Sequence, residues 1–179
     1  LRTFYLIKVV NISLRLTRAG ICSKTPMSRP VYLLVFNSPL FPAHWAMYIP
    51  SQCSGKLINV RGDPGLGFWH EFERNYDPNC TRDKKTLLHL CDVKDKHLLD
   101  VPGDGNPSID TNAVDDIERV ALCLNPPPKT LRSLDTPTVS GKITIQNCQT
   151  WMYQLVEALV EANIMPVVAL EVLDGAPRN

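Results

Sequence analysis

The first half of the chain is constrained by a run of short extended segments that are apolar, β-branched or aromatic. These segments are residues 31–36, 44–49, 56–61, 67–76 and 86–93. Turn-forming residues such as Asn37-Ser38-Pro39 and Gly62-Asp63-Pro64-Gly65 separate them. Strands of this length with brief connections predict an antiparallel sheet joined by hairpins.

The alternation within two of these segments predicts which side chains share a face of the sheet. A strand over 44–49 places His44, Ala46 and Tyr48 on one face and Trp45, Met47 and Ile49 on the other. In the next segment the same period places Leu57, Asn59 and Arg61 together. Asn59 is a polar interruption among apolar neighbours, so its side chain is expected to need a hydrogen-bond partner.

A strongly periodic helix is predicted to begin at Cys148 and to end before Asn163 and Pro166. Its apolar stripe consists of Trp151, Met152, Leu155, Val156, Leu159 and Val160. Asn147 is a good N-cap for this helix. Cys148 falls on the apolar side, so its sulfur is expected to face whatever the helix packs on.

The remaining elements are predicted from local signals. A polar loop at 102–112 closes the strand-rich part, and Thr111 or Asn112 is expected to cap a helix that runs to about Leu124. A short strand is expected at Lys142–Ile145, and a last short helix at Val167–Leu173. The predicted fold class is therefore α+β, with an antiparallel β-sheet packed against a C-terminal helix that bears Cys148.

The length of 179 residues suits one domain, which we place at 27–179. The preceding residues 1–26 contain five Lys or Arg side chains and no acidic residue. They are expected to be poorly ordered, as a targeting segment or as sequence outside the folded protein, which would then begin at Met27. A cytoplasmic location is expected, with a mitochondrial one as the alternative if 1–26 is a presequence.

Charge and cysteine usage exclude several classes of function. A formal net charge of +1 argues against a nucleic-acid-binding domain, which usually carries a basic face. No apolar stretch is long enough for a membrane-spanning helix, so we expect a soluble protein without stable membrane insertion. The six cysteines are scattered and form no C-x-x-C pair, so neither a metal nor another cofactor is expected.

Three residues are the candidates for chemistry. Cys148 in the first turn of a helix lies beside free backbone N–H groups and the positive end of the helix dipole, which favour a thiolate and supply oxyanion donors. A nucleophilic thiol also needs a base and a group that orients the base. His44 and Asn59 are the best candidates for these two roles. The simpler alternative is that Cys148 is a buried small hydrophobe.

These residues carry a resemblance to known enzymes. His44-Trp45-Ala46-Met47-Tyr48 and Asn147-Cys148 resemble motifs of lecithin:retinol acyltransferase-like proteins, a circularly permuted branch of the papain-like NlpC superfamily. Gly62-Asp63-Pro64-Gly65-Leu66-Gly67-Phe68 and Glu71-Phe72-Glu73-Arg74-Asn75-Tyr76 look more like a group of small fungal proteins of unassigned function. Asn59 stands where the acyltransferases have a second histidine, and Gln149-Thr150-Trp151 replaces their E-H-F.

The resemblance implies a permuted papain-like (NlpC-like) architecture and a Cys148-His44-Asn59 triad. Such a triad implies a hydrolase or acyltransferase that acts on an amide, peptide or ester bond of a small-molecule or peptide substrate through an acyl-thioester. In that scheme Cys148 attacks a carbonyl, His44 handles the proton and Asn59 orients His44. The alternative is a non-catalytic binding or interaction module that retains the fold.

Overall fold

The computed structural model describes residues 27–52, 54–80, 84–130 and 146–179. The strands are β1 (Ser28–Phe36), β2 (His44–Pro50), β3 (Gly55–Asp63), β4 (Gly67–Arg74), β5 (Lys85–Lys94) and β6 (Ser108–Asp110). The helices are η1 (Asp95–His97, a 3-10 turn), α1 (Asp116–Cys123), α2 (Cys148–Glu161) and α3 (Val168–Asp174). The expectations for residues 1–26 and for a strand at Lys142–Ile145 concern residues outside this described part.

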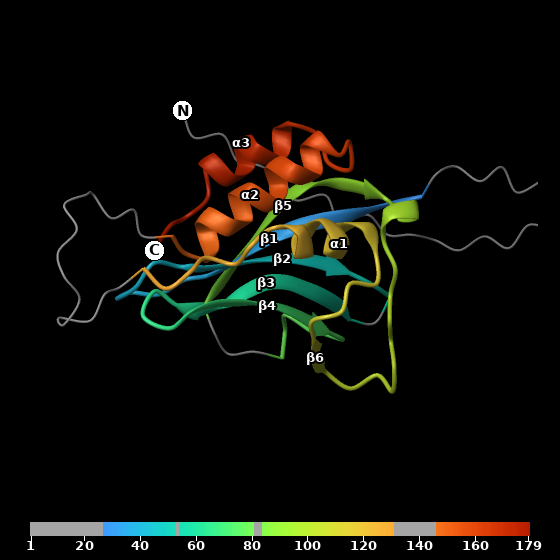
Figure 1. Ribbon diagram of the computed structural model, residues 1–179. Helices are drawn as coiled ribbons and strands as arrows, with labels where there is room; N and C mark the ends of the chain where they lie inside the picture. Colours follow the sequence, from blue (N-terminus) through green and yellow to red (C-terminus); the bar gives the residue numbers. More distant parts are fainter. Residues whose placement is uncertain (1–26, 53, 81–83, 131–145) are drawn as a thin grey trace, which may run out of the picture.

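All six strands form one sheet in the order β5-β1-β2-β3-β4-β6, and every neighbouring pair is antiparallel. Helices α1, α2 and α3 lie together on one side of this sheet (Figure 1). The predicted α+β class, with an antiparallel sheet packed against the helix that bears Cys148, is confirmed. No helix within the described residues is both long and apolar enough to cross a membrane.

The two faces of the sheet bury different side chains. On the helix face, the main core combines Trp45, Met47 and Ile49 of β2 with the apolar stripe of α2. On the second face, a smaller cluster contains Leu34, Ala46, Tyr48, Leu57 and Tyr76. Helix α2 therefore packs on the face whose side chains offer the larger apolar area.

The start of the connection from β4 to β5 packs on the second face. Three strands lie between β4 and β5 in the sheet, and the described parts of the connection are residues 75–80 and residue 84. Near its start, the ring of Tyr76 packs edge-on against Tyr48 of the second face, with 6.0 Å between ring centroids. At its end, the carbonyl oxygen of Lys84 accepts a hydrogen bond from the Asn37 amide in the β1–β2 turn.

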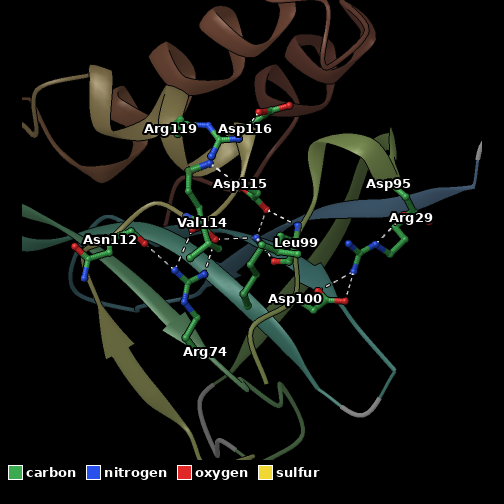
Figure 2. Close-up of polar contacts among 12 residues, drawn as sticks. Arg29, Arg74, Asp95, Leu99, Asp100, Asn112, Val114, Asp115, Asp116 and Arg119 are labelled. Carbon is green, nitrogen blue, oxygen red and sulfur yellow. Dashed lines mark hydrogen bonds and ion pairs between the residues drawn. The ribbon is translucent and has the colours of Figure 1, made fainter. Parts of the chain in front are cut away.

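A buried cluster of charges joins α1 to the sheet. Lys56 of β3 makes ion pairs with Asp115 and Glu118, and Arg74 of β4 binds the same Glu118 carboxylate. Arg74 also binds Asp110 of β6 at 2.9 Å. Figure 2 shows Arg74 reaching from the sheet toward Asn112, and Asp115 directed toward Leu99. Since each buried charge has an opposite partner, the cluster fixes the position of α1 and β6 on the strands.

Two details of the sequence prediction are wrong in this region. Helix α1 begins at Asp116 and is capped by Asp115, whose side chain accepts a hydrogen bond from the Glu118 amide, whereas Thr111 or Asn112 was expected as the cap. The loop predicted at 102–112 contains the short strand β6. Both differences follow from Arg74, which binds the Asp110 carboxylate and the Asn112 carbonyl and so holds this segment extended along β4.

Candidate functional site

Cys148 is the first residue of α2, where the chain folds as the sequence predicts. Asn147 caps the helix, and its side-chain oxygen accepts hydrogen bonds from the Gln149 and Thr150 amides. The thiol is buried in the main core and lies 3.9 Å from the carbonyl oxygen of Ala43, just before β2. Cys148 therefore faces the sheet, as expected for a residue on the apolar stripe.

The C-terminal segment closes this region on the helix face. The Ala43 amide donates to the carbonyl of Arg178 at 2.8 Å, and the Trp45 indole donates to the carbonyl of Pro177 at 2.9 Å. Gln149 Nε2 bridges the carbonyls of Ala43 and Arg178. These contacts hold the end of the chain over the first turn of α2 and help to keep Cys148 from solvent.

Burial raises the pKa of the Cys148 thiol above its ordinary value. The backbone N–H groups of Trp45, Gln149 and Cys148 itself act in the opposite direction, because they stabilise a thiolate, but they do not offset the burial. The group is therefore a protonated thiol at neutral pH.

His44 is the first residue of β2, and its side chain lies on the second face of the sheet. It is paired with Phe36 of β1, and the two rings lie 5.7 Å apart between centroids. Burial, followed by the nearby positive charge of Arg61, lowers the pKa of His44 to about 4. The imidazole is consequently neutral at physiological pH.

Asn59 lies behind His44 on β3, also on the second face. Its Nδ2 atom donates to the carbonyl of Glu71 at 3.3 Å. The side chain is 1% exposed, and its Oδ1 atom has no hydrogen-bond partner of good geometry. Asn59 nevertheless lies close enough to the imidazole to favour its protonated form and to raise the pKa of His44. Its buried oxygen is thus available to accept a hydrogen bond from an N–H of His44.

The structure therefore brings His44 and Asn59 together and places Cys148 elsewhere. The alternation of β2 directs Trp45 toward the main core that contains Cys148 and directs His44 to the second face. No hydrogen bond joins Cys148 and His44 among the described residues. The two side chains approach β2 from opposite sides, with the strand backbone between them.

A cavity of about 600 Å³ opens in front of His44. We call it the His44 pocket, and it is lined by Phe36, Asn37, Ser38, Pro39, His44, Arg61 and Lys84. Its walls come from the end of β1, the β1–β2 turn, the start of β2, the end of β3 and the residue before β5. Cys148 is not among the lining residues.

Sequence reasoning identified His44 and Asn59 but missed the charged neighbours that shape this pocket. The period of β3 predicts that Arg61 lies on the same face as Asn59, but it does not predict a role for Arg61. On β4, Glu71 pairs with Asn59, and Glu73 forms a hydrogen bond with Glu71. Burial, followed by the charge of Glu71, raises the pKa of Glu73. The available signal was the strand period, which puts Glu71 with Glu73 on one face of β4 and Asn59 with Arg61 on one face of β3.

A second cavity of about 360 Å³ lies at the opposite end of β3 and is lined in part by Lys56 and Arg74. Both cations are already bound to the carboxylates of the buried cluster. Neither of these two cations is therefore free to bind a ligand in this cavity. Within the described residues, no group of three or more His, Cys, Asp or Glu side chains is arranged to hold a metal ion.

The fold and the site together define an α+β protein in which a single antiparallel sheet carries a buried helix-borne thiol on one face and a histidine pocket on the other. The model of a family described as "Family of unknown function (DUF6540)" matches residues 31–166, and the chain belongs to this family. Neither the curated proteins nor the solved structures give a match to the chain.

Proposed function

We propose that the protein is a non-catalytic binding module and that the His44 pocket is its ligand site. The observation that carries this proposal is the separation of His44 from Cys148 by the backbone of β2. A thiol enzyme needs its base within hydrogen-bond reach of the nucleophile. Here His44 faces a cavity of about 600 Å³ that Cys148 does not line.

The size and the lining of the pocket also favour binding. Its volume falls in the range of about 300–1,000 Å³ that is usual for small-molecule sites. Apolar groups of Phe36 and Pro39 stand beside the polar groups of His44, Arg61 and Lys84. A mainly apolar wall with a few convergent polar groups is typical of a site that orients a small ligand.

The proposal includes a permuted papain-like (NlpC-like) architecture. The support for it is the order of the elements along the chain: a strand that begins with His44, a strand that bears Asn59, and a late helix that begins with Cys148. In this proposal the chain retains that arrangement of elements. The second face of the sheet, which carries His44, binds a ligand without converting it.

A screen by thermal denaturation tests the binding function. A ligand present at 100 times its dissociation constant stabilises the folded state by about 2.7 kcal/mol, which raises the melting temperature of a chain of this size by about 5–10 °C. We expect members of a small-molecule library to stabilise the full chain. Lys84→Trp, which places a large ring at the opening of the pocket, is expected to abolish the shift.

Lys96→Trp is the matched control. Lys96 is exposed and lies in η1, which follows the C-terminal end of β5, whereas Lys84 lies just before the N-terminal end of that strand. This variant should keep the full shift. A library that gives no stabilising compound, or compounds that stabilise parent and Lys84→Trp equally, would contradict a ligand site in the His44 pocket.

A cysteine-dependent hydrolase or acyltransferase is the second candidate, and one observation favours it. The sulfur of Cys148 lies near the N–H groups of Trp45, Gln149 and Cys148, which are donors of the kind that stabilise an oxyanion. A thiol-directed activity probe tests this candidate. Enzyme function predicts that labelling of the parent is lost in Cys148→Ala and strongly reduced in His44→Ala, whereas the binding module predicts equal labelling of all three proteins.

A further inference from the structure

We propose that the ligand of the His44 pocket is a small organic oxyanion, whose carboxylate or phosphate head group is bound by Arg61 and Lys84 beside His44, and whose apolar body lies on Phe36 and Pro39. This inference rests on the proposed binding function and goes further by naming the chemical class of the ligand.

The charges of the lining residues point to an anion. The seven lining side chains include two cations, Arg61 and Lys84, and no carboxylate. The nearest acidic groups on the adjacent strand are Glu71 and Glu73, which form a hydrogen bond with each other. A site with two cations and no acid on its walls attracts negative charge.

Arg61 forms one long ion pair with Glu71 and remains open to solvent. Its side chain is 58% exposed, and its Nη1 atom lies 3.9 Å from Glu71 Oε1, beyond the length of a good hydrogen bond. Its positive charge is nevertheless felt at the imidazole of His44. The guanidinium group can therefore present its parallel N–H donors to an oxyanion, which is the geometry that arginine binds best.

The pairing of His44 with Asn59 adds a third donor. A protonated His44 could donate one N–H to the unpartnered Oδ1 of Asn59 and the other to a bound oxyanion. Burial and Arg61 oppose this protonation in the empty pocket. An anion that neutralises Arg61 removes part of this opposition, so we expect the bound state to take up a proton at His44.

The charged groups around the imidazole support the expectation that anion binding favours protonation of His44. Arg61 on β3 and Lys84 before β5 line the pocket, and Glu71 on β4 lies 3.9 Å from Arg61. Asp77, in the β4–β5 connection, interacts with Lys85 at the start of β5. The head group would therefore contact the cations directly, because no carboxylate belongs to the pocket wall.

Isothermal titration calorimetry on the full chain with four ligands of one shape tests the inference. The ligands share a phenylpropyl body and end in a carboxylate, a phosphate, a neutral hydroxyl or an ammonium group. We expect the carboxylate or the phosphate to bind about 10-fold or more tightly than the alcohol, because charged hydrogen bonds are the stronger ones. The ammonium compound should bind most weakly, and the two anions distinguish a carboxylate site from a phosphate site.

Three variants locate the head group. Arg61→Met and Lys84→Met should each weaken the anion by about 10-fold and leave the alcohol within about 2-fold. Lys96→Met changes the net charge by the same amount at an exposed position outside the pocket, so it should leave both affinities unchanged. The carboxylate should also bind more tightly at pH 5.5 than at pH 7.5, because His44 then gains its proton more readily.

The outcomes separate this inference from the function on which it rests. An alcohol that binds as tightly as both anions would overturn the oxyanion inference and leave a ligand site in the pocket. Equal weakening of the anion by Lys96→Met would overturn it as well, since the effect would then be one of net charge. If none of the four compounds binds while the library screen yields stabilising ligands, the ligand class is wrong and the binding function stands.

Discussion

The thiol of Cys148 lies 3.9 Å from the carbonyl oxygen of Ala43, the residue that immediately precedes His44. The two candidate reactive groups are thus close along β2 but separated by its backbone. A hydrogen bond from a thiol to a backbone carbonyl stabilises the protonated form, as burial does. This relationship accounts for a helix-borne cysteine that packs as part of the core.

Alkylation measures the state of this thiol. Because the pKa of Cys148 is raised and the group is buried, we expect iodoacetamide to modify it much more slowly at pH 7.5 than the exposed Cys123. The rate should increase as the pH is raised toward 10 and should be the same in His44→Ala. Faster modification of Cys148 than of Cys123, together with a slower rate in His44→Ala, would indicate a base in contact with the thiol.

The pKa of His44 can be followed by NMR of the imidazole. It should lie at about 4 in the parent protein. Arg61→Gln removes the positive charge and is expected to raise the pKa, whereas Asn59→Leu removes the favourable neighbour and is expected to lower it. A titration near pH 6.5 that neither variant moves would show that His44 is not buried beside these residues.

The same lowered pKa makes stability depend on pH. The unfolded chain binds a proton at His44 below its ordinary value of 6.5, but the folded protein does so only near pH 4. The free energy of unfolding should therefore be highest above pH 6.5 and should fall toward pH 4 by roughly 1 kcal/mol per pH unit from this residue. Urea denaturation of His44→Gln should lack this part of the slope, and an identical slope in both proteins would contradict it.

Glu118 is the centre of the buried charge cluster, and its side chain is 0% exposed. Glu118→Gln leaves Lys56 and Arg74 with too little negative charge, so we expect the free energy of unfolding to fall by about 3–5 kcal/mol. Glu161→Gln, at an exposed position near the end of α2, is the control and should change it by less than about 0.5 kcal/mol. Equal urea midpoints for both variants would contradict a structural role for the cluster.

Acid should also act on this cluster. Burial alone would raise the pKa of Glu118, but hydrogen bonds from Arg74 and the charge of Lys56 outweigh burial and lower it below its ordinary value of 4.5. A carboxylate whose pKa is lowered by folding stabilises the fold above pH 4.5. This stabilisation is lost as the pH falls through the pKa of the folded state. The stability of Glu118→Gln should therefore decline less below pH 4.5 than that of the parent, as measured by chemical denaturation.

The sequence was sufficient to predict that His44, Ala46 and Tyr48 share a face and that Cys148 is buried, because both follow from the period of one strand or one helix. The predicted triad requires α2 on the face of His44, whereas α2 packs on the opposite face of β2, with Trp45 and Met47. Both faces of β2 carry apolar side chains, so the alternation alone leaves this open. The larger side chains Trp45 and Met47 were the signal, since a helix packs on the more apolar face.

The start of α1 shows a different limit. Asn112 and Asp115 are both good cap residues, and local sequence does not choose between them. Arg74, 38 positions away from Asn112, binds its carbonyl and decides the choice through a tertiary contact. Asp115 with Glu118 three residues later resembles a capping box and would have favoured the observed start.

The most direct test of the central claim is an NMR titration of the His44 imidazole with a ligand from the screen, in the parent protein and in Cys148→Ala. A binding module that uses the His44 pocket predicts that the His44 resonance shifts in both proteins, with dissociation constants equal within about 2-fold and an unchanged ligand. Conversion of the ligand by the parent and not by Cys148→Ala, or saturable binding that leaves the His44 resonance unmoved, would contradict it.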